Sequence, residues 1–287
     1  MMMNDKIKLI NGNELPLVGL GTSARGKKFT PQEFVDSIKH ALSVGYRLID
    51  TAKLYNNEHL IAKALKESKQ VKRDEVFLVS KVPPDELGYD RTLKAFETSC
   101  KQLHVDYLDL YLIHFPGKAP SNRSKEATTT TDDYEKARQL RLDSWRALVK
   151  LYEEGKCKAI GVSNYMTRHL NEIVEAKLMM PMVNQCEFHC YYTNREIYDA
   201  CNQMNIQFMG YCPLAKGALL NEELVKRLGE KYGKSPAQIA IKWSAQNRVL
   251  TIPASINLAR IEENFKVAIP FLSANHFLSI YLKHCYF

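Results

Sequence analysis

The chain has 287 residues, of which 45% are hydrophobic and 25% are charged, and its formal net charge is +8. This composition fits one large globular domain or two small ones, with enough chain for a core in either case. Nothing along the sequence divides it, so we expect a single domain, residues 1–287. No apolar run reaches the ~20 residues of a membrane span, and the N-terminus lacks the apolar stretch of a signal peptide, so we expect a cytoplasmic protein that does not enter membranes.

The distribution of charge and cysteine narrows the function further. Basic residues are interleaved with acidic ones and form no stripe, which argues against nucleic-acid binding. The seven cysteines are odd in number and include no C-x-x-C pair, so we expect neither a disulfide framework nor a bound metal.

The first predicted elements are a hairpin and a helix. Residues 7–18 contain two apolar stretches around an Asn-Gly-Asn sequence at 11–13, a pattern typical of a β-hairpin. Residues 30–45 then show helical periodicity with a proline at the first helical position. Thr30 can cap this helix, and Gly45 can end it.

Eight short apolar runs then alternate with amphipathic stretches along the rest of the chain. The runs are "LPLVGLGT", "LIDTA", "EVFLVSK", "YLDLYLIH", "CKAIGVSN", "MVNQCEF", "IQFMGYCPL" and "VLTIPAS". In a chain of this length such βα repetition predicts a (β/α)₈ TIM barrel and disfavours an open doubly wound sheet. The polar residues 118–133 are expected to leave the barrel as a loop after the fourth strand.

Polar residues end several of these apolar runs. In barrels of this class chemistry takes place at the carboxyl ends of the strands, so these side chains are expected to face one mouth. They are Asp50 in the second run, Lys81 in the third, His114 in the fourth, Ser163 and Asn164 in the fifth, and Gln185 and Glu187 in the sixth.

Four residues at this mouth suggest a specific chemistry. Singly, a lysine or histidine at a strand end is usually structural or solvated, so their joint placement carries the hypothesis. Lys81 would pair with Asp50, and an ammonium beside Tyr55 would favour the phenolate and lower a pKa that is ordinarily ~10. Tyr55 then becomes a usable acid, and His114 can donate a hydrogen bond to a substrate oxygen. The set suits carbonyl reduction.

Two other motifs point to different nucleotide-binding folds. The sequence "GLGTSA" at 19–24 fits the dinucleotide fingerprint, but the next predicted helix begins only after Thr30, too late to receive a pyrophosphate. Tyr152 and Lys156 have the Y-x-x-x-K spacing of short-chain dehydrogenases. Gly155 lies between them where a helix is expected to end, so the spacing does not align them on one helix face.

Several segments resemble, in order and spacing, the signatures of the aldo-keto reductases. They are "LPLVGLGT", "IDTAKLYNNE", "VSK", "LYLIHFPG", "AIGVSNY", "VNQCEFH", "YCPLAKGALL" and "IPASINLARIEENF". The resemblance covers roughly residues 7–268 and is closest to the short glyoxal and 2,5-diketogluconate reductases. It implies reduction of small aldehydes and ketones by NADPH, with NADH as the weaker cofactor.

The resemblance also implies roles for individual residues. The catalytic tetrad would be Asp50, Tyr55, Lys81 and His114, in which Tyr55 protonates the carbonyl oxygen, Lys81 and Asp50 tune it and His114 orients the substrate.

The implied cofactor bed is larger. The nicotinamide would lie against Tyr211, with its carboxamide held by Ser163, Asn164 and Gln185. The remaining implied contacts are Gly21, Thr22, Pro213, Leu214 and Ala215 for the ribose and pyrophosphate, and Ser255, Arg260, Glu263 and Asn264 for the adenosine end.

The sequence departs from the family pattern in several places. Ala254 stands where the family commonly has lysine, Cys212 where it has serine, and Cys190 where it has proline. After residue 268 the pattern is lost, which predicts an atypical, short C-terminal tail at 269–287. We expect a monomer, with self-association through apolar tail residues as the alternative.

A second functional class stays open. Barrels such as the potassium-channel β-subunits bind a nicotinamide cofactor and serve mainly as partners of other proteins, with little turnover. The intact tetrad favours the enzyme.

Overall fold

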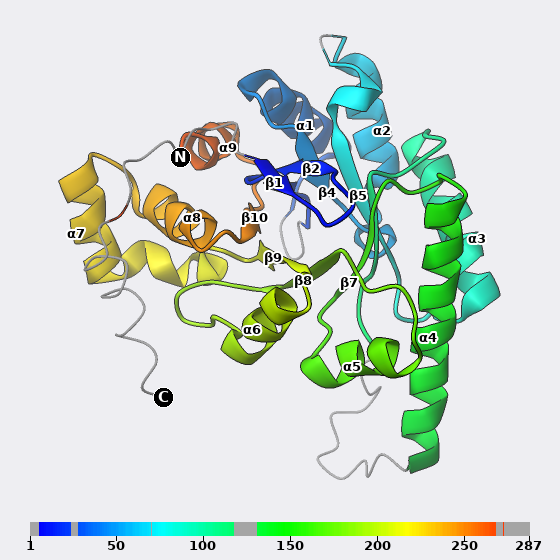
Figure 1. Ribbon diagram of the computed structural model, residues 1–287. Helices are drawn as coiled ribbons and strands as arrows, with labels where there is room; N and C mark the ends of the chain where they lie inside the picture. Colours follow the sequence, from blue (N-terminus) through cyan, green and yellow to red (C-terminus); the bar gives the residue numbers. More distant parts are fainter. Residues whose placement is uncertain (1–5, 24–27, 70, 118–130, 268–271, 273–287) are drawn as a thin grey trace.

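The computed structural model describes residues 6–23, 28–69, 71–117, 131–267 and 272. Its central feature is a sheet of eight parallel strands, in which strands consecutive along the chain are neighbours (Figure 1). Bridges from Val18 to Thr251 and from Gly21 to Ala254 join the first strand to the last. The sheet is therefore closed, and the predicted (β/α)₈ barrel is confirmed.

Each of the eight predicted apolar runs contributes one strand to this barrel. The strands are β3 (Leu20–Gly21), β4 (Leu48–Asp50), β5 (Phe77–Val82), β6 (Leu110–Ile113), β7 (Ile160–Ser163), β8 (Val183–Glu187), β9 (Gln207–Tyr211) and β10 (Leu250–Ile252). The helices are α1 (Pro31–Val44), α2 (Glu58–Glu67), α3 (Tyr89–Leu103), α4 (Thr131–Glu153), α5 (Thr167–Glu175), α6 (Arg195–Gln203), α7 (Glu223–Tyr232), α8 (Pro236–Gln246) and α9 (Leu258–Phe265). Short 3₁₀ turns are η1 (Lys53–Tyr55), η2 (Arg73–Glu75) and η3 (Ala215–Asn221).

The predicted hairpin consists of β1 (Lys6–Lys8) and β2 (Glu14–Pro16), which pair antiparallel. At its turn the side-chain amides of Asn11 and Asn13 donate to the carbonyl oxygen of Lys158, at 2.9 and 2.6 Å. Because Lys158 precedes β7, the hairpin lies across the amino-terminal end of the barrel (Figure 1). The carboxyl ends of the strands, where chemistry is expected, are left to the βα loops.

The first helix shows how the sequence sets its own limits. Thr30 and Glu33 form a reciprocal capping box, and Pro31 occupies the first turn. At the other end Gly45 adopts a φ of 119°, a conformation that costs a residue with a side chain, and its N–H caps the last carbonyls. A Cβ at Gly45 would also lie 3.0 Å from the ring of Phe265 in α9, so glycine serves both the turn and the packing.

Two expectations about the segments on either side of α4 can be compared with the structure. The expected loop at 118–133 is wrong at its end, because residues 131–133 already form the first turn of α4, whose acidic residues favour a helix start. The rest of that segment lies outside the described residues. Tyr152 and Lys156 share no helix, because α4 ends at Glu153 and Gly155 has a φ of 70°.

The described part of the segment "GLGTSA", residues 19–23, contains β3 and no helix, and α1 begins at Pro31. The dinucleotide fingerprint is therefore not used as one. Of the divergent tail only Leu272 is described, and it is fully buried. The side-chain amide of Gln246 in α8 donates to the carbonyl oxygen of Leu272 and accepts from its N–H, both at 3.0 Å.

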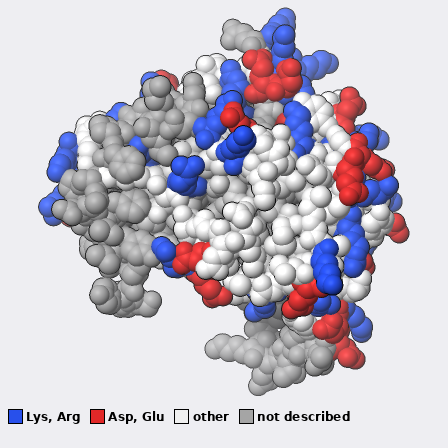
Figure 2. All heavy atoms as spheres, in the orientation of Figure 1, with Lys and Arg blue, Asp and Glu red and all other residues white. Residues whose placement is uncertain are grey.

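The described surface carries both signs of charge. On the face shown in Figure 2, lysine and arginine side chains are interspersed with aspartate and glutamate. Among the helices that the structure describes, none is both long and apolar enough to cross a bilayer.

Candidate active site

A buried ion pair forms the floor of the barrel mouth. The Lys81 ammonium in β5 lies 2.7 Å from Oδ1 of Asp50 in β4 and donates to the carbonyl oxygen of Thr51 at 2.8 Å. Lys81 is 0% and Asp50 2% exposed. Burial alone lowers the pKa of Lys81, but the carboxylate of Asp50 and the phenol of Tyr55 outweigh it and raise that pKa. Lys81 is therefore a permanent cation at neutral pH.

The aromatic members of the predicted tetrad lie above this ion pair. The Lys81 ammonium is 5.1 Å from the ring centroid of Tyr55. The rings of Tyr55 and His114 meet edge to face, with centroids 5.5 Å apart and planes at 81°. His114 stacks in turn on Phe115, at a centroid distance of 4.8 Å. The structure thus brings all four predicted catalytic side chains together, while their roles stay predictions.

The turn that carries Tyr55 is fixed by residues that the sequence reading did not single out. Tyr55 belongs to η1, where its N–H donates to the carbonyl oxygen of Ala52 at 2.9 Å. The next helix is entered through Asn57, whose side chain accepts from the Thr51 hydroxyl at 2.7 Å and donates to the Thr22 carbonyl at 3.0 Å. The sequence signal for Asn57 as an anchor was its position next to Glu58 at the start of an amphipathic helix.

A second cluster links the ends of β6, β7, β8 and β9. Asn164 adopts a left-handed φ of 61°, and its side-chain amide donates to the carbonyl oxygen of His114 at 2.9 Å while accepting from the Tyr211 hydroxyl at 2.8 Å. The Ser163 hydroxyl donates to the carbonyl oxygen of Gln185 at 2.8 Å. Gln185 donates through Nε2 to Oδ2 of Asp50 at 2.7 Å, which joins this cluster to the ion pair.

The aromatic side chain of this cluster is half-buried at the end of β9. Burial, reinforced by the carboxylate of Glu187, raises the pKa of Tyr211, so it stays a neutral phenol. Its ring is therefore available as an apolar wall, and its hydroxyl orients the Asn164 amide. Glu187 itself faces His189, with Oε1 and Nε2 3.3 Å apart.

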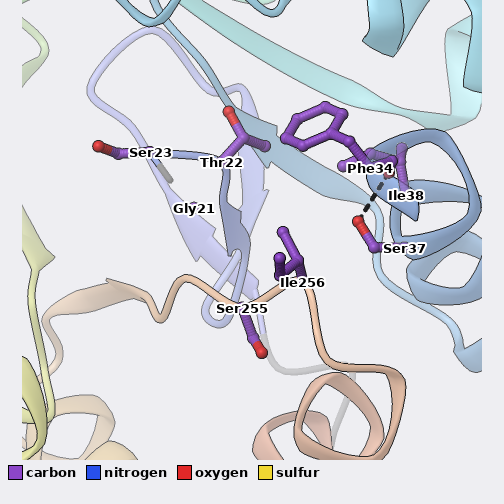
Figure 3. A pocket seen from close by; sticks show the side chains of 8 residues that line it. All are labelled: Gly21, Thr22, Ser23, Phe34, Ser37, Ile38, Ser255 and Ile256. Atoms are coloured by element: carbon purple, nitrogen blue, oxygen red, sulfur yellow. Dashed lines mark hydrogen bonds between the residues drawn. The ribbon is translucent and has the colours of Figure 1, made fainter. Parts of the chain in front are cut away.

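The ends of β3 and β10 lie side by side. Figure 3 shows Gly21 and Thr22 on one side of a small hollow, Ser255 and Ile256 on the other, and Phe34 of α1 beside Thr22. A Cβ at Gly21 would come within 2.8 Å of the carbonyl oxygen of Ile252, so this close approach requires glycine. The N–H and hydroxyl of Thr22 donate to the carbonyl oxygen of Asp50, at 3.0 and 2.9 Å.

The loop after β9 has an unusual backbone. Ala215 and Lys216 both have positive φ, 48° and 55°, and Gly217 follows at 99°. Pro213 is buried and Leu214 is half-buried, and the Gly217 N–H donates to the Leu214 carbonyl at 2.8 Å. Non-glycine residues in left-handed conformations cluster at ligand sites because the surrounding structure must impose them.

The last predicted cofactor contacts surround the start of α9. The N–H of Arg260 donates to the side chain of Asn257, which caps the helix, and the N–H of Asn257 donates to the Ser255 hydroxyl. The Arg260 side chain is exposed and forms no ion pair with a carboxylate in the part of the chain that the structure describes. Ala254 is exposed at the same bend.

The other two residues of this group lie one turn further along α9. Asn264 is buried, and Glu263 is half-buried with its carbonyl oxygen accepting from Gln238 of α8. A guanidinium, a hydroxyl and the N-terminal end of a helix are donors that suit a phosphate group. The residues present therefore fit the phosphate-bearing end of a dinucleotide.

Metal chemistry has no obvious site in this arrangement. Within the described ranges, no three histidine, cysteine, aspartate or glutamate side chains gather closely enough to hold an ion. Ionisable groups at the mouth pair with one another: Lys81 with Asp50, and Glu187 with His189.

Comparison with known proteins identifies the family. A family model described as "Aldo/keto reductase family" matches residues 17–279. Glyoxal reductase from Bacillus subtilis (strain 168) is 44% identical over 262 residues, which span 91% of this chain and 86% of that protein. A mutant of Gox0644 in complex with NADPH matches with a TM-score of 0.85 and 34% identity, covering 97% of this chain and 93% of that one.

A more distant solved structure agrees in fold. The aldo-keto reductase of Bombyx mori in complex with NADP matches with a TM-score of 0.85 and 26% identity, over 98% of this chain and 93% of that one. The family model covers most of the barrel, including all eight strands and the four residues at its mouth. The chain therefore belongs to the aldo/keto reductase family of oxidoreductases.

Proposed function

We propose that this reductase transfers hydride from NADPH to small aldehydes and ketones, with Tyr55 as the general acid. One observation carries the proposal: the Lys81 ammonium, fully buried and held by Asp50, lies over the ring of Tyr55 while His114 meets that ring edge to face. A buried cation beside a phenol is the arrangement that makes tyrosine a proton donor near neutral pH.

Each residue of the mouth has a distinct task in this mechanism. NADPH, when bound, supplies the hydride that reduces the carbonyl carbon. Tyr55 gives its phenolic proton to the carbonyl oxygen as negative charge develops there. The Lys81 ammonium stabilises the phenolate that remains, and Asp50 keeps that ammonium in place. His114 donates a hydrogen bond that orients the carbonyl toward Tyr55.

The cofactor bed follows from the clusters around this centre. Ser163, Asn164 and Gln185 would hold the nicotinamide carboxamide, and Tyr211 would stack against the ring so that only one face is open. The relatives solved with NADPH and NADP support this choice of cofactor.

The rest of the bed would hold the phosphates and the adenosine. The contacts are Gly21, Thr22, Pro213, Leu214 and Ala215 for the ribose and pyrophosphate, and Ser255, Arg260, Glu263 and Asn264 for the adenosine end. Arg260 would meet the 2′-phosphate with a planar fork of donors, which favours NADPH over NADH. Because the exposed residue 254 is alanine, this preference would be weaker than in relatives that have lysine there.

The compartment, assembly and substrate belong to the same proposal. Six cysteines are described and all are free thiols, which supports a reducing, cytoplasmic compartment. We expect a monomer, with self-association as the alternative. The likeness to glyoxal reductase supports small dicarbonyl compounds as a substrate class.

The decisive test is turnover. Consumption of NADPH with methylglyoxal and 4-nitrobenzaldehyde, measured by absorbance, should follow saturation kinetics, and cofactor binding should quench the protein's fluorescence. Binding of NADPH without turnover of any aldehyde would favour the alternative, a cofactor-binding partner protein. Light scattering after size exclusion tests the monomer.

A further inference from the structure

An ion pair at the rim of the mouth joins two neighbouring βα loops. The ammonium of Lys53 donates to both carboxylate oxygens of Glu86, each at 2.8 Å. The side chains are 25% and 31% exposed, so the pair is partly withdrawn from water. Both residues lie beyond the carboxyl ends of strands, Lys53 after β4 and Glu86 after β5.

These two loops also carry the proton donor and its charged neighbour. Lys53 opens the turn η1, in which Tyr55 is the last residue. Hydrogen bonds from Tyr55 N–H to the Ala52 carbonyl and from Asn56 N–H to the Lys53 carbonyl make this turn one rigid unit. Movement of Lys53 therefore carries Tyr55 with it.

The loop of Glu86 is equally constrained. It continues directly from β5, whose residue Lys81 faces Tyr55, and the N–H of Glu86 donates to the Pro83 carbonyl at 3.0 Å. Behind it, Glu58 of α2 is buried and accepts from the Ser80 hydroxyl at 2.6 Å. Burial raises the pKa of Glu58, and the charges of Lys53 and Lys81 oppose that shift.

We infer that the Lys53–Glu86 ion pair is a positioning clamp that fixes the distance between Tyr55 and Lys81. The inference rests on the proposed role of Tyr55 as the acid. The buried pair of Lys81 with Asp50 holds the cation from below, and the bond from Lys81 to the Thr51 carbonyl ties it to the chain that enters η1. The rim pair adds a side-chain restraint between the two loops at Lys53, inside η1 itself.

The sensitive quantity is the stabilisation of the Tyr55 phenolate. The ionisable groups that face Tyr55 are Lys81 of β5, with Asp50 behind it, His114 after β6 and Tyr211 of β9. Of these only Lys81 is a buried cation. A shift from 4 to 5 Å between an ammonium and a phenolate weakens their attraction by an amount equal to about half a pKa unit at an effective dielectric of roughly 20.

The test is a double-mutant cycle of Lys53→Met and Glu86→Gln. Each single variant should lower kcat roughly three- to tenfold, leave KM for NADPH within about twofold, and raise the kinetic pKa of the acid by about half a unit. The double variant should be no worse than either single variant, because one interaction is lost in all three. Lys53→Arg, which keeps a bidentate donor, should stay near the parent.

A second ion pair provides the matched control. Lys39 of α1 and Glu67 of α2 are 2.9 Å apart, with 36% and 35% of their side chains exposed. Glu67 is at the C-terminal end of α2, away from the barrel mouth. Glu67→Gln should therefore leave kcat and the pH profile unchanged while costing a similar small amount of thermal stability.

A direct titration separates this inference from the proposed function. The chain has 15 tyrosines, so the ultraviolet titration of each protein is compared with that of the same protein carrying Tyr55→Phe. The difference curve reports Tyr55 alone and needs no turnover. If the parent reduces no aldehyde, the proposed function is wrong, yet the clamp still predicts a higher Tyr55 titration midpoint in Glu86→Gln.

The clamp itself is overturned by either of two results. One is a parental kcat and titration midpoint in Glu86→Gln. The other is a double variant whose losses are the product of the single losses, which would mean that Lys53 and Glu86 act independently.

Discussion

Replacement of Lys81 by methionine removes one half of a buried ion pair and leaves the other half in place. Methionine fills a similar volume, so little packing is lost. Asp50, 2% exposed, loses the ammonium and keeps the Gln185 amide as a side-chain donor. An uncompensated buried charge of this kind costs about 3–5 kcal/mol, a large share of the ~5–15 kcal/mol by which domains are stable.

Urea unfolding followed by circular dichroism measures this cost, and the melting temperature should fall by roughly 10 °C. The control is the double variant Asp50→Asn with Lys81→Met, in which the orphaned charge is also removed. It should recover about 2 kcal/mol or more, because neutral replacement of both partners is tolerated. A single variant within about 1 kcal/mol of the parent, or a double variant no more stable than the single one, would refute the reasoning.

The difference in free energy of unfolding between the parent and Lys81→Met should depend on pH with a defined sign. In the folded protein the pKa of Lys81 is raised above its ordinary value, with burial opposing the shift and Asp50 and Tyr55 producing it. The stabilisation is therefore complete below the pKa of the unfolded chain and is lost as pH rises through the folded-state pKa. The stability gap between the parent and Lys81→Met should be constant across neutral pH and narrow only in strong alkali. In the pH–rate profile of Lys81→Met, the kinetic pKa assigned to Tyr55, which sets the alkaline limb, should be raised, or activity should be abolished.

Further predictions concern the cofactor and a second buried group. Arg260→Ala should weaken NADPH binding by about 1.5–3 kcal/mol and leave NADH unaffected in fluorescence titrations; an unchanged ratio of the two dissociation constants would place the 2′-phosphate elsewhere. Ala254→Lys should strengthen NADPH binding by ~1 kcal/mol, and equal gains for NADH would contradict a phosphate contact. Burial, followed by the charge of Arg141, lowers the pKa of His169 to about 4. The stabilisation by neutral His169 is fully present above about pH 6.5 and is lost as pH falls toward the folded-state pKa. His169→Asn should therefore reduce the loss of unfolding free energy between pH 7 and pH 5 by about 2 kcal/mol. Parallel plots of unfolding free energy against pH for the two proteins would exclude this role.

The parts of the fold that depend on local pattern could be predicted from the sequence. Each barrel strand appears as an apolar run because both faces of a closed parallel sheet are covered, one by the barrel interior and one by helices. The capping signals of α1 act within four residues of each end, so Thr30 and Gly45 marked it correctly. The mouth residues Asp50, Lys81 and His114 could be found because a single rule, that strand ends face one mouth, places them together.

What could not be predicted depends on side chains that meet across loops. Lys53 and Glu86 lie on different loops in sequences without any signature, and only the folded chain shows that they pair. The left-handed conformation of Asn164 and its bond to Tyr211 also follow from the positions of four strands at once. The start of α4 was missed because its first turn is as polar as the loop that precedes it.

Buried ion pairs between helices were invisible for the same reason. Arg141 of α4 binds both carboxylate oxygens of Glu172 in α5, at 2.8 and 2.5 Å, although charged residues in helical patterns normally indicate a solvated face. Its guanidinium also donates to the carbonyl oxygen of Pro116, two residues beyond His114. The geometry of the mouth is thus supported by contacts that no local pattern encodes.

The role of Tyr55 is tested most directly by Tyr55→Phe, since the change deletes one hydroxyl and keeps the ring that packs against His114. The measurement is single-turnover oxidation of NADPH by an aldehyde, with the dissociation constant of NADPH determined on the same samples. Loss of the general acid should slow the chemical step roughly 10²- to 10⁴-fold and leave cofactor affinity nearly unchanged. A variant that reduces aldehydes within about threefold of the parent rate would show that another group donates the proton.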